Sequence, residues 1–196
     1  MTYEMLTLEV VPGAVEQVEA RLAEAREKQK DSSALAASWH TEIGPLNQIV
    51  QIWRNEALKP PADRLVRAVL VDTLRLTPFS PEPAAGRMGP IFEMRTYALP
   101  AGGLKLAFDN WERALPARLA LSPLWGIFHS ERDGVERLVH VWPYASLNQR
   151  MELRAAATSR GIWPPRAVAL KDGREALSYV AQETKILLPS SFSPLQ

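Results

Sequence analysis

Apolar and polar side chains alternate along several short stretches of the chain, and this period of two predicts β-strands. Other stretches place apolar residues every three or four positions, which predicts amphipathic helices. We expect strands over 3–10, 35–43, 46–54, 69–77, 91–99, 124–132, 135–142 and 178–188. We expect helices over 14–30, 62–68, 104–115, 146–157 and 165–171, with Pro116 kinking or ending the third. Each half then follows the order βαββαβ, which is typical of a ferredoxin-like unit.

The two halves also match each other at a fixed offset of 89 positions. That offset carries His40 onto His129 and Trp53 onto Trp142. A fixed spacing over many positions indicates an internal duplication. We therefore predict a first unit at residues 1–78, a linker rich in proline and glycine at 79–90, and a second unit at 91–196.

The hairpin over 124–142 has a register that can be read from its turn. Asp133-Gly134 is a strong signal for a two-residue turn, so Arg132 pairs with Val135 and Ser130 with Arg137. Residues that oppose each other share a face, and the face alternates along the strand. One face then carries Phe128, Ser130, Val139 and Val141. The other face carries Trp125, Ile127, His129, Glu131, Leu138, His140 and Trp142.

We expect the small apolar face to pack against the helices of its own unit. The aromatic and polar face of each unit would then stack against that of the other, giving a barrel-like interior between two sheets. The first unit would add Ser38, His40, Glu42, Ile49, Gln51 and Trp53 to this interior. The strand over 91–99 would add Glu93, Arg95 and Tyr97, in preference to Phe92, Met94 and Thr96. In this arrangement Trp142 and Trp53 hold the two sheets together.

Composition and charge narrow the classes of partner. Lys plus Arg number 23 against 22 for Asp plus Glu, so the chain lacks the basic footprint of a nucleic-acid-binding protein. The absence of cysteine excludes disulfides and thiol nucleophiles. No apolar run approaches the ~18 residues of a membrane span, and the first residues do not resemble a signal peptide. We expect a cytoplasmic protein with no membrane span.

Several segments resemble the NIPSNAP family. They are the sequence FEMRTY at 92–97, LSP at 121–123, VHVWPY at 139–144, FSP at 192–194 and, in the first half, WHTEIGPLNQIVQIW at 39–53. The resemblance covers both halves and implies an α+β fold, a dimeric α+β-barrel of ferredoxin-like units, here fused in tandem within one chain. It implies no settled chemistry, so no catalytic set is carried over. The first half has Gln51 where the second has His140, which predicts an asymmetric site weighted toward the second unit.

Candidate chemistry lies on the face that carries the two histidines. His129 and His140 are diagonal neighbours, and histidine is the usual proton shuttle near neutral pH. Glu131 and its equivalent Glu42 are candidate acid or base groups. The predicted catalytic candidates are thus His129, His140 and Glu131, and the predicted ligand-binding set is Arg95, Tyr97, Trp125, His129, His140, Trp142, His40 and Trp53. Each has a structural alternative: histidines held by hydrogen bonds, solvated glutamates, and tryptophans in the core.

Two functions remain open from the sequence. The first is a protein that binds or transforms a small organic ligand, with or without an anionic group, between the sheets. The second is a non-catalytic scaffold with a packed barrel interior, whose outer surfaces meet partners or a second copy of the chain. No metal is expected, because none of the three histidines has a motif spacing, and no cofactor is expected. A polar cavity between the sheets would favour the first function.

Overall fold

The computed structural model describes residues 2–28, 34–55 and 63–196. The first half contains β1 (Thr2–Val10), α1 (Val15–Glu27), β2 (Leu35–Ile43), β3 (Gln48–Arg54) and β4 (Val66–Leu76). The second half contains β5 (Ile91–Ala98), α2 (Leu104–Leu119), β6 (Gly126–Arg132), β7 (Val135–Tyr144), α3 (Leu147–Ser159), α4 (Pro165–Lys171) and β8 (Ala181–Pro189). Helix α2 continues through Pro116 to Leu119.

The strands close into one barrel in the order β1-β3-β2-β8-β5-β7-β6-β4. Within it, each half supplies four antiparallel strands in the same relative order, β4-β1-β3-β2 and β8-β5-β7-β6. Two antiparallel seams join the halves, one between β2 and β8 and one between β4 and β6. The predicted α+β fold, a dimeric α+β-barrel formed within one chain, is confirmed.

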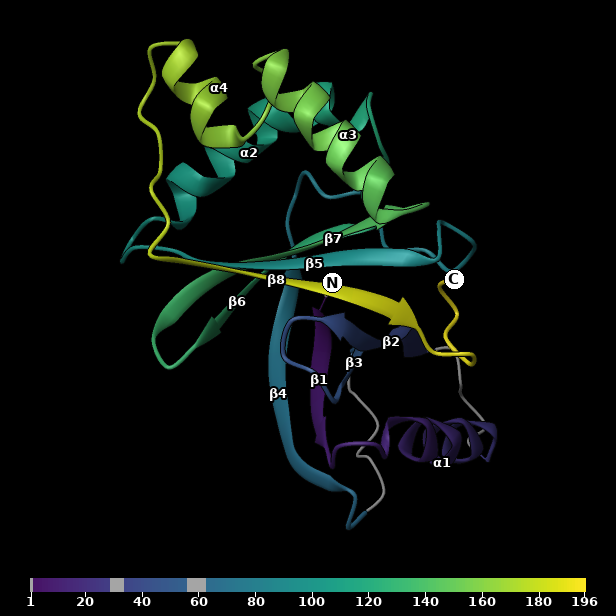
Figure 1. The fold of residues 1–196 in the computed structure, drawn as a ribbon. Coiled ribbons are helices and arrows are strands. Elements are labelled where there is room, and N and C mark those ends of the chain that lie inside the picture. The colour runs from purple at the N-terminus through teal and green to yellow at the C-terminus, as the bar shows by residue number, and fades with distance from the viewer. Residues whose placement is uncertain (1, 29–33, 56–62) are drawn as a thin grey trace.

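The helices cover the barrel from outside. Figure 1 shows α2, α3 and α4 together above β5 and β7, and α1 apart from them beside the first-half strands. Trp111 and Leu115 of α2 are buried in one cluster with Leu138 and Trp142 of β7. Helix α3 starts as its sequence predicts, since Ser146 Oγ accepts a hydrogen bond from the Gln149 backbone N–H at 3.1 Å. No helix among the described residues is long and apolar enough to cross a membrane.

The pairing predicted for the hairpin of β6 and β7 can be checked directly. The hairpin register is confirmed, since Arg132 pairs with Val135 and Ser130 with Arg137, around a turn in which Asp133 and Gly134 both have positive φ.

The helix predicted over 62–68 is wrong where it can be checked. Residue 62 lies outside the described residues, and β4 already begins at Val66 and pairs with β1. The β-branched valines of this segment favour a strand over a short helix.

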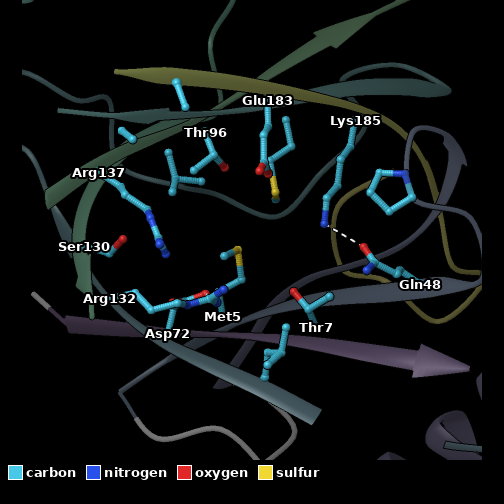
Figure 2. A pocket seen from close by; sticks show the side chains of 16 residues that line it. Met5, Thr7, Gln48, Asp72, Thr96, Ser130, Arg132, Arg137, Glu183 and Lys185 are labelled. Atoms are coloured by element: carbon cyan, nitrogen blue, oxygen red, sulfur yellow. Dashed lines mark hydrogen bonds and ion pairs between the residues drawn. The ribbon is translucent and has the colours of Figure 1, made fainter. Parts of the chain in front are cut away.

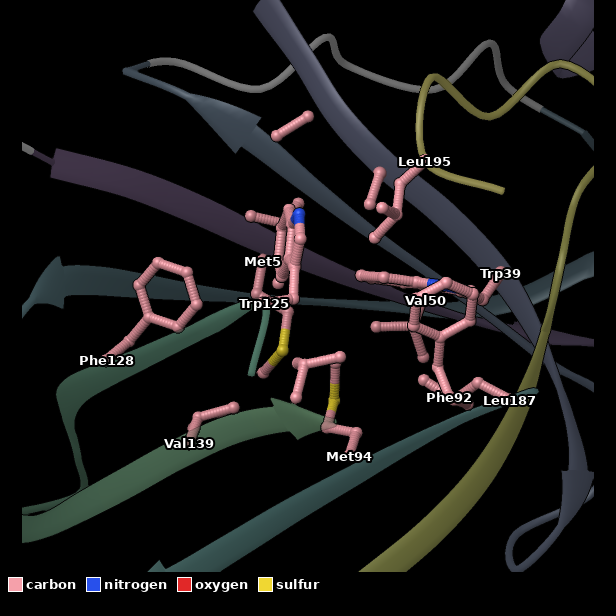
Figure 3. Close-up of a cluster of buried hydrophobic side chains, with 14 of the residues drawn as sticks. Met5, Trp39, Val50, Phe92, Met94, Trp125, Phe128, Val139, Leu187 and Leu195 are labelled. Carbon is pink, nitrogen blue, oxygen red and sulfur yellow. The ribbon is translucent and has the colours of Figure 1, made fainter. Parts of the chain in front are cut away.

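The predicted orientation of the sheet faces is also wrong, because the two faces are exchanged. Phe128, Val139 and Val141 point into the barrel with Phe92 and Met94, as Figure 3 shows for all but Val141. The predicted interior set instead lies on the outer faces of the two sheets. It comprises Ile127, His129, Leu138, His140, Trp142, Glu93, Arg95 and Tyr97 in the second half, and His40, Ile49, Gln51 and Trp53 in the first.

Contacts with the helix layer explain the exchange. The rings of His140 and Trp142 pack with Trp111 of α2 and with Trp163, so the opposite face of β7, which carries Val139 and Val141, is left to the barrel interior. The ring centroid of Trp163 lies 5.1 Å from that of Trp111 and 5.7 Å from that of Trp142. Trp125 is the exception, because it precedes β6 and its ring turns inward to lie 5.5 Å from that of Trp39.

Candidate functional site

The barrel interior is packed with apolar side chains along one part of its length. Aromatic rings meet there edge to face, with 5.2 Å between the centroids of Tyr3 and Phe128. Trp39, Phe92 and Trp125 continue the cluster, and all five rings are at least 98% buried. This part is a buried core that joins the two halves.

The other part of the interior holds a polar cavity of about 320 Å³ between the two sheets (Figure 2). Residues from both halves line it: Met5, Thr7, Pro45, Gln48, Leu70, Asp72, Met94, Thr96, Ala98, Ser130, Arg132, Arg137, Val139, Ala181, Glu183 and Lys185. Side chains of opposite sign and several hydroxyl groups thus face one space that only the closed barrel creates.

Side chains alternate between the two faces of each strand, so every second residue of a strand points into the interior. An inward position near the packed part is apolar, and the next inward positions along the same strand are polar. On β7 the inward side chains run from Val139 to Arg137, and on β8 from Leu187 to Lys185 and Glu183. The inward-facing side chains of one strand therefore form the apolar core along one part of the barrel and line the cavity along the next part.

The charged groups of the cavity differ in how firmly they are held. Arg132 donates two hydrogen bonds to the buried carboxylate of Asp72, one of them 2.6 Å from Nε to Oδ1. Lys185 Nζ donates to Gln48 Oε1 at 2.7 Å, and burial lowers the pKa of this lysine. Within the described chain, the guanidinium of Arg137 makes no hydrogen bond or ion pair.

This arrangement suits a ligand that carries a carboxylate. Three cations and two carboxylates line the cavity, so the lining has a positive excess. Arg132 is neutralised by Asp72, whereas Arg137 has all its N–H donors available and Lys185 has two remaining after its bond to Gln48. A guanidinium binds a carboxylate through two parallel hydrogen bonds, and these are stronger than neutral ones.

His140, a predicted catalytic candidate, lies outside this cavity, in the layer between β7 and α2. It is 1% exposed, and its Nδ1 accepts a hydrogen bond from Trp142 Nε1 at 2.6 Å. Burial, and then the nearby arginines including Arg95, hold the pKa of His140 well below 6.5. The imidazole is therefore neutral at physiological pH and serves as an acceptor for the indole.

The first half repeats this contact with a different residue. Gln51 Oε1 accepts a hydrogen bond from Trp53 Nε1 at 3.2 Å, at the positions equivalent to His140 and Trp142. Both halves therefore provide a buried acceptor two residues before a buried indole. A shared structural role explains the His140–Gln51 difference without any proton transfer.

The other predicted site residues also lie apart from the cavity. His129 faces Phe108 with ring centroids 5.6 Å apart, and burial lowers its pKa. Glu131 is exposed and pairs in the strand register with Glu136, and Trp125 belongs to the packed part of the interior. His40 contacts Glu19 of α1 at 3.1 Å, and Trp53 packs with Leu6 and Leu35. Two of the predicted ligand-binding residues, Arg95 and Tyr97, line a second cavity, which is described below.

The cavity residues were missed for an identifiable reason. The register places Arg137 opposite Ser130, so their common location was already predicted, but on a face assigned to the helices. Asp72 and Lys185 come from strands of different halves, and no spacing in the sequence links them. In the described part of the chain, no group of three or more His, Cys, Asp or Glu residues is arranged to hold a metal ion.

Comparison with known proteins gives matches over most of the chain. A family model described as NIPSNAP matches residues 3–70 and 92–194. Protein NipSnap of Drosophila melanogaster is 25% identical over an alignment of 190 positions that covers 84% of this chain and 66% of that protein. Protein NipSnap homolog 3A of Homo sapiens is 34% identical over an alignment of 109 positions that covers 54% of this chain and 42% of that protein. The match thus spans less than two thirds of the length of either relative.

Solved structures match in two ways. A crystal structure of a NIPSNAP family protein from Agrobacterium tumefaciens is 30% identical, with 56% of this chain and 96% of that chain covered and a TM-score of 0.45. A crystal structure of a putative monooxygenase from Lactobacillus acidophilus covers 97% of this chain and 94% of that chain, with a TM-score of 0.61. Its identity of 10% supports a shared fold alone.

Proposed function

The chain belongs to the NIPSNAP family, and we propose that it binds a small organic acid in the polar cavity between its two sheets. The observation that carries the proposal is the guanidinium of Arg137, which lines this cavity without a partner in the described chain. A cation in a cavity is stabilised by an anion that the ligand supplies.

The ligand would be held at two points. Arg137 would take a carboxylate through two hydrogen bonds, and Lys185, which already donates to Gln48, would add a third. The methyl groups of Met5 and Met94 would cover the apolar part of the ligand. The volume of about 320 Å³ lies at the lower end of the ~300–1,000 Å³ of ligand pockets, so the ligand is small.

The competing function is a scaffold protein with a packed interior. The packed aromatic part of the barrel fits that function, but the polar part does not. Thr7 and Ser130 are at most 5% exposed, and their hydroxyl groups face a cavity in a barrel whose neighbouring layers are apolar. Polar groups are buried at a cost unless they are partnered, and binding a polar ligand supplies those partners.

A thermal-shift screen tests the proposal. The panel would hold small mono-, di- and hydroxycarboxylic acids, each beside its uncharged amide. A ligand that binds only the folded state raises the melting temperature, so acids should raise it and amides should not. Arg137→Gln should weaken binding by roughly tenfold or more, the effect of losing a charge-assisted hydrogen-bonded pair.

The matched control is Arg67→Gln, which removes the same charge from an exposed position of β4 that does not line the cavity. This variant should bind like the unmodified protein. A screen in which no acid stabilises the protein, or in which both variants respond alike, would contradict the proposal and favour the scaffold function.

A further inference from the structure

On the outward face of β5, one buried carboxylate is surrounded by guanidinium groups from β5 and from α3. The Glu93 side chain is 0% exposed, and Arg150 and Arg95 approach its Oε1 at 2.5 and 3.2 Å. Arg154 lies 3.9 Å from its Oε2. One negative charge therefore faces three positive charges in the layer between sheet and helices. The three arginine side chains are 12%, 22% and 37% exposed, so the excess positive charge lies where an anion from solution can reach it.

A second cavity, of about 190 Å³, lies beside this cluster. Figure 1 shows α3 and α4, which contribute to it, above the part of the sheet that contains β5. The described residues that line it are Arg95, Tyr97, Arg154, Thr158, Trp163, Pro164, Pro165, Arg166, Tyr179 and Gln182. Three of them are arginines and none is acidic, so the lining is purely cationic in its formal charge.

The polar groups of this lining offer donors. Arg95 Nε is buried and has no hydrogen-bond partner among the described residues. The Tyr179 hydroxyl accepts a hydrogen bond from Trp111 Nε1 at 2.9 Å, which leaves its own proton available to donate. Burial raises the pKa of Tyr179 to about 12 and also raises the pKa of Tyr97, so both hydroxyls stay protonated at neutral pH. Converging donors of this kind suit an acceptor-rich oxyanion.

The equivalent positions of the first half show that the fold does not need these groups. The offset of 89 positions carries Arg95 onto Leu6 and Tyr97 onto Leu8, and both leucines are at least 98% buried. Apolar side chains therefore fill these two positions where packing alone is required, and the second half replaces them with a cation and a hydroxyl.

We propose that this second cavity binds the phosphate group of a small phosphorylated molecule. Arg95, Arg150 and Arg154 against Glu93 leave two positive charges, and Arg166 in the lining adds a third. A phosphate monoester carries about −1.5 to −2 at pH 7 and would offset most of this excess. Arg154 and Arg166 approach from the two helices, while Arg95 approaches from the sheet. Trp163 and the adjacent prolines form an apolar wall against which the body of the molecule would pack.

This site is independent of the cavity between the sheets. The linings of the two cavities share no residue, and they lie on opposite faces of β5, since Thr96 and Ala98 face inward and Arg95 and Tyr97 outward. A substitution that abolishes binding at one site should therefore leave binding at the other site unchanged. Phosphate binding in the second cavity can thus be tested separately from acid binding between the sheets.

Isothermal titration calorimetry of the full chain with phenyl phosphate, in a low-salt buffer free of phosphate, tests the proposal. Phenol serves as the uncharged control ligand. Arg154→Gln and Arg166→Gln each remove one cation from a helix, where the Arg154 side chain is 37% exposed and Arg166 is exposed. Each variant should bind phenyl phosphate about 10- to 100-fold more weakly, the effect of losing a hydrogen bond to a charged group.

Two control variants locate the binding. Arg113→Gln removes an exposed cation from α2, and Arg137→Gln removes a cation from the cavity between the sheets. Both should keep the affinity of the unmodified protein, and phenol should give no heat of binding. Failure of the unmodified protein to bind phenyl phosphate would overturn the proposal, and so would unchanged affinity in both Arg154→Gln and Arg166→Gln. A loss confined to Arg137→Gln would place the phosphate between the sheets instead and would also overturn it.

Discussion

The hydrogen bond from Trp142 to His140 defines what the histidine does. The ring is buried and neutral, and the first half achieves the same contact with Gln51 and Trp53. His140→Gln should therefore unfold within about 1 kcal/mol of the unmodified protein, since glutamine is an acceptor of proven fit in the first half. His140→Leu should lose roughly 1–3 kcal/mol, because the indole N–H of Trp142 is then buried without a partner.

Urea unfolding of the two variants beside the unmodified protein measures this difference. If both variants unfolded at the same urea concentration, the acceptor would not be what His140 contributes. Because His140 does not line the cavity between the sheets, His140→Gln should also keep its affinity for organic acids.

The lowered pKa of His140 makes the stability of the fold depend on pH. The pKa of His140 is lower in the folded chain than in the unfolded chain, so just below pH 6.5 the unfolded chain binds a proton at this residue and the folded chain does not. The free energy of unfolding should therefore fall as pH drops below 6.5, by about 1.4 kcal/mol per pH unit from this group, until the folded pKa is reached. His140→Gln should lose that part of the slope. Urea unfolding at several pH values checks it, and identical slopes in both proteins would contradict the expectation.

At the scale of the element, β7 is joined to its covering helices by Trp142. Its ring lies 5.7 Å from that of Trp163, and the guanidinium of Arg118 on α2 lies 4.5 Å over it. Trp142→Ala should lower the free energy of unfolding by about 3–5 kcal/mol, because a buried indole leaves a cavity that the layer cannot refill. Met151→Ala on α3, where the side chain is 64% exposed, is the control and should change little.

Denaturant unfolding compares the two variants. A midpoint for Trp142→Ala equal to that of the unmodified protein would contradict the packing described for this layer. The expected cause differs from the one that the sequence indicated, since Trp142 fixes helices to a sheet and does not bridge the two sheets.

The hairpin β6–β7 shows which part of an element the sequence can predict. The pairing of Arg132 with Val135 follows from the local chemistry of Asp133-Gly134, so the register was predictable. Which face turns inward was not, because period-two alternation has two equivalent orientations. The choice depends on which face packs against the helices, and those contacts form only in the folded protein.

At the scale of the whole molecule, both seams of the barrel join one half to the other. The buried interior cluster mixes residues such as Trp39 and Tyr3 with Trp125 and Phe128. We propose that residues 1–78 and 91–196 are the two units, joined by the segment 79–90. A chain containing residues 79–196 alone should then self-associate or aggregate, because its apolar sheet face and two edge strands would be exposed.

Light scattering of that half chain checks the expectation. A soluble, stable monomer would contradict it. The order of elements in the second half, the offset of 89 positions and the resemblance to the NIPSNAP family predicted the barrel, because each can be read from segments of the sequence. The cavity could not be predicted, because Asp72, Arg137 and Lys185 come together only when the two seams close.

The central claim is that a small organic acid binds between the sheets, and methionine methyl signals test it most directly. Met5 and Met94 line that cavity, whereas Met151 is exposed on α3. Protein labelled with ¹³C at the methionine methyl groups would be titrated by NMR with an acid found in the screen. The signals of Met5 and Met94 should shift and saturate together, while that of Met151 stays in place, and Arg137→Gln should abolish the shifts at the same concentrations. Unmoved Met5 and Met94 signals under conditions where the acid stabilises the protein would place the ligand elsewhere and contradict the claim.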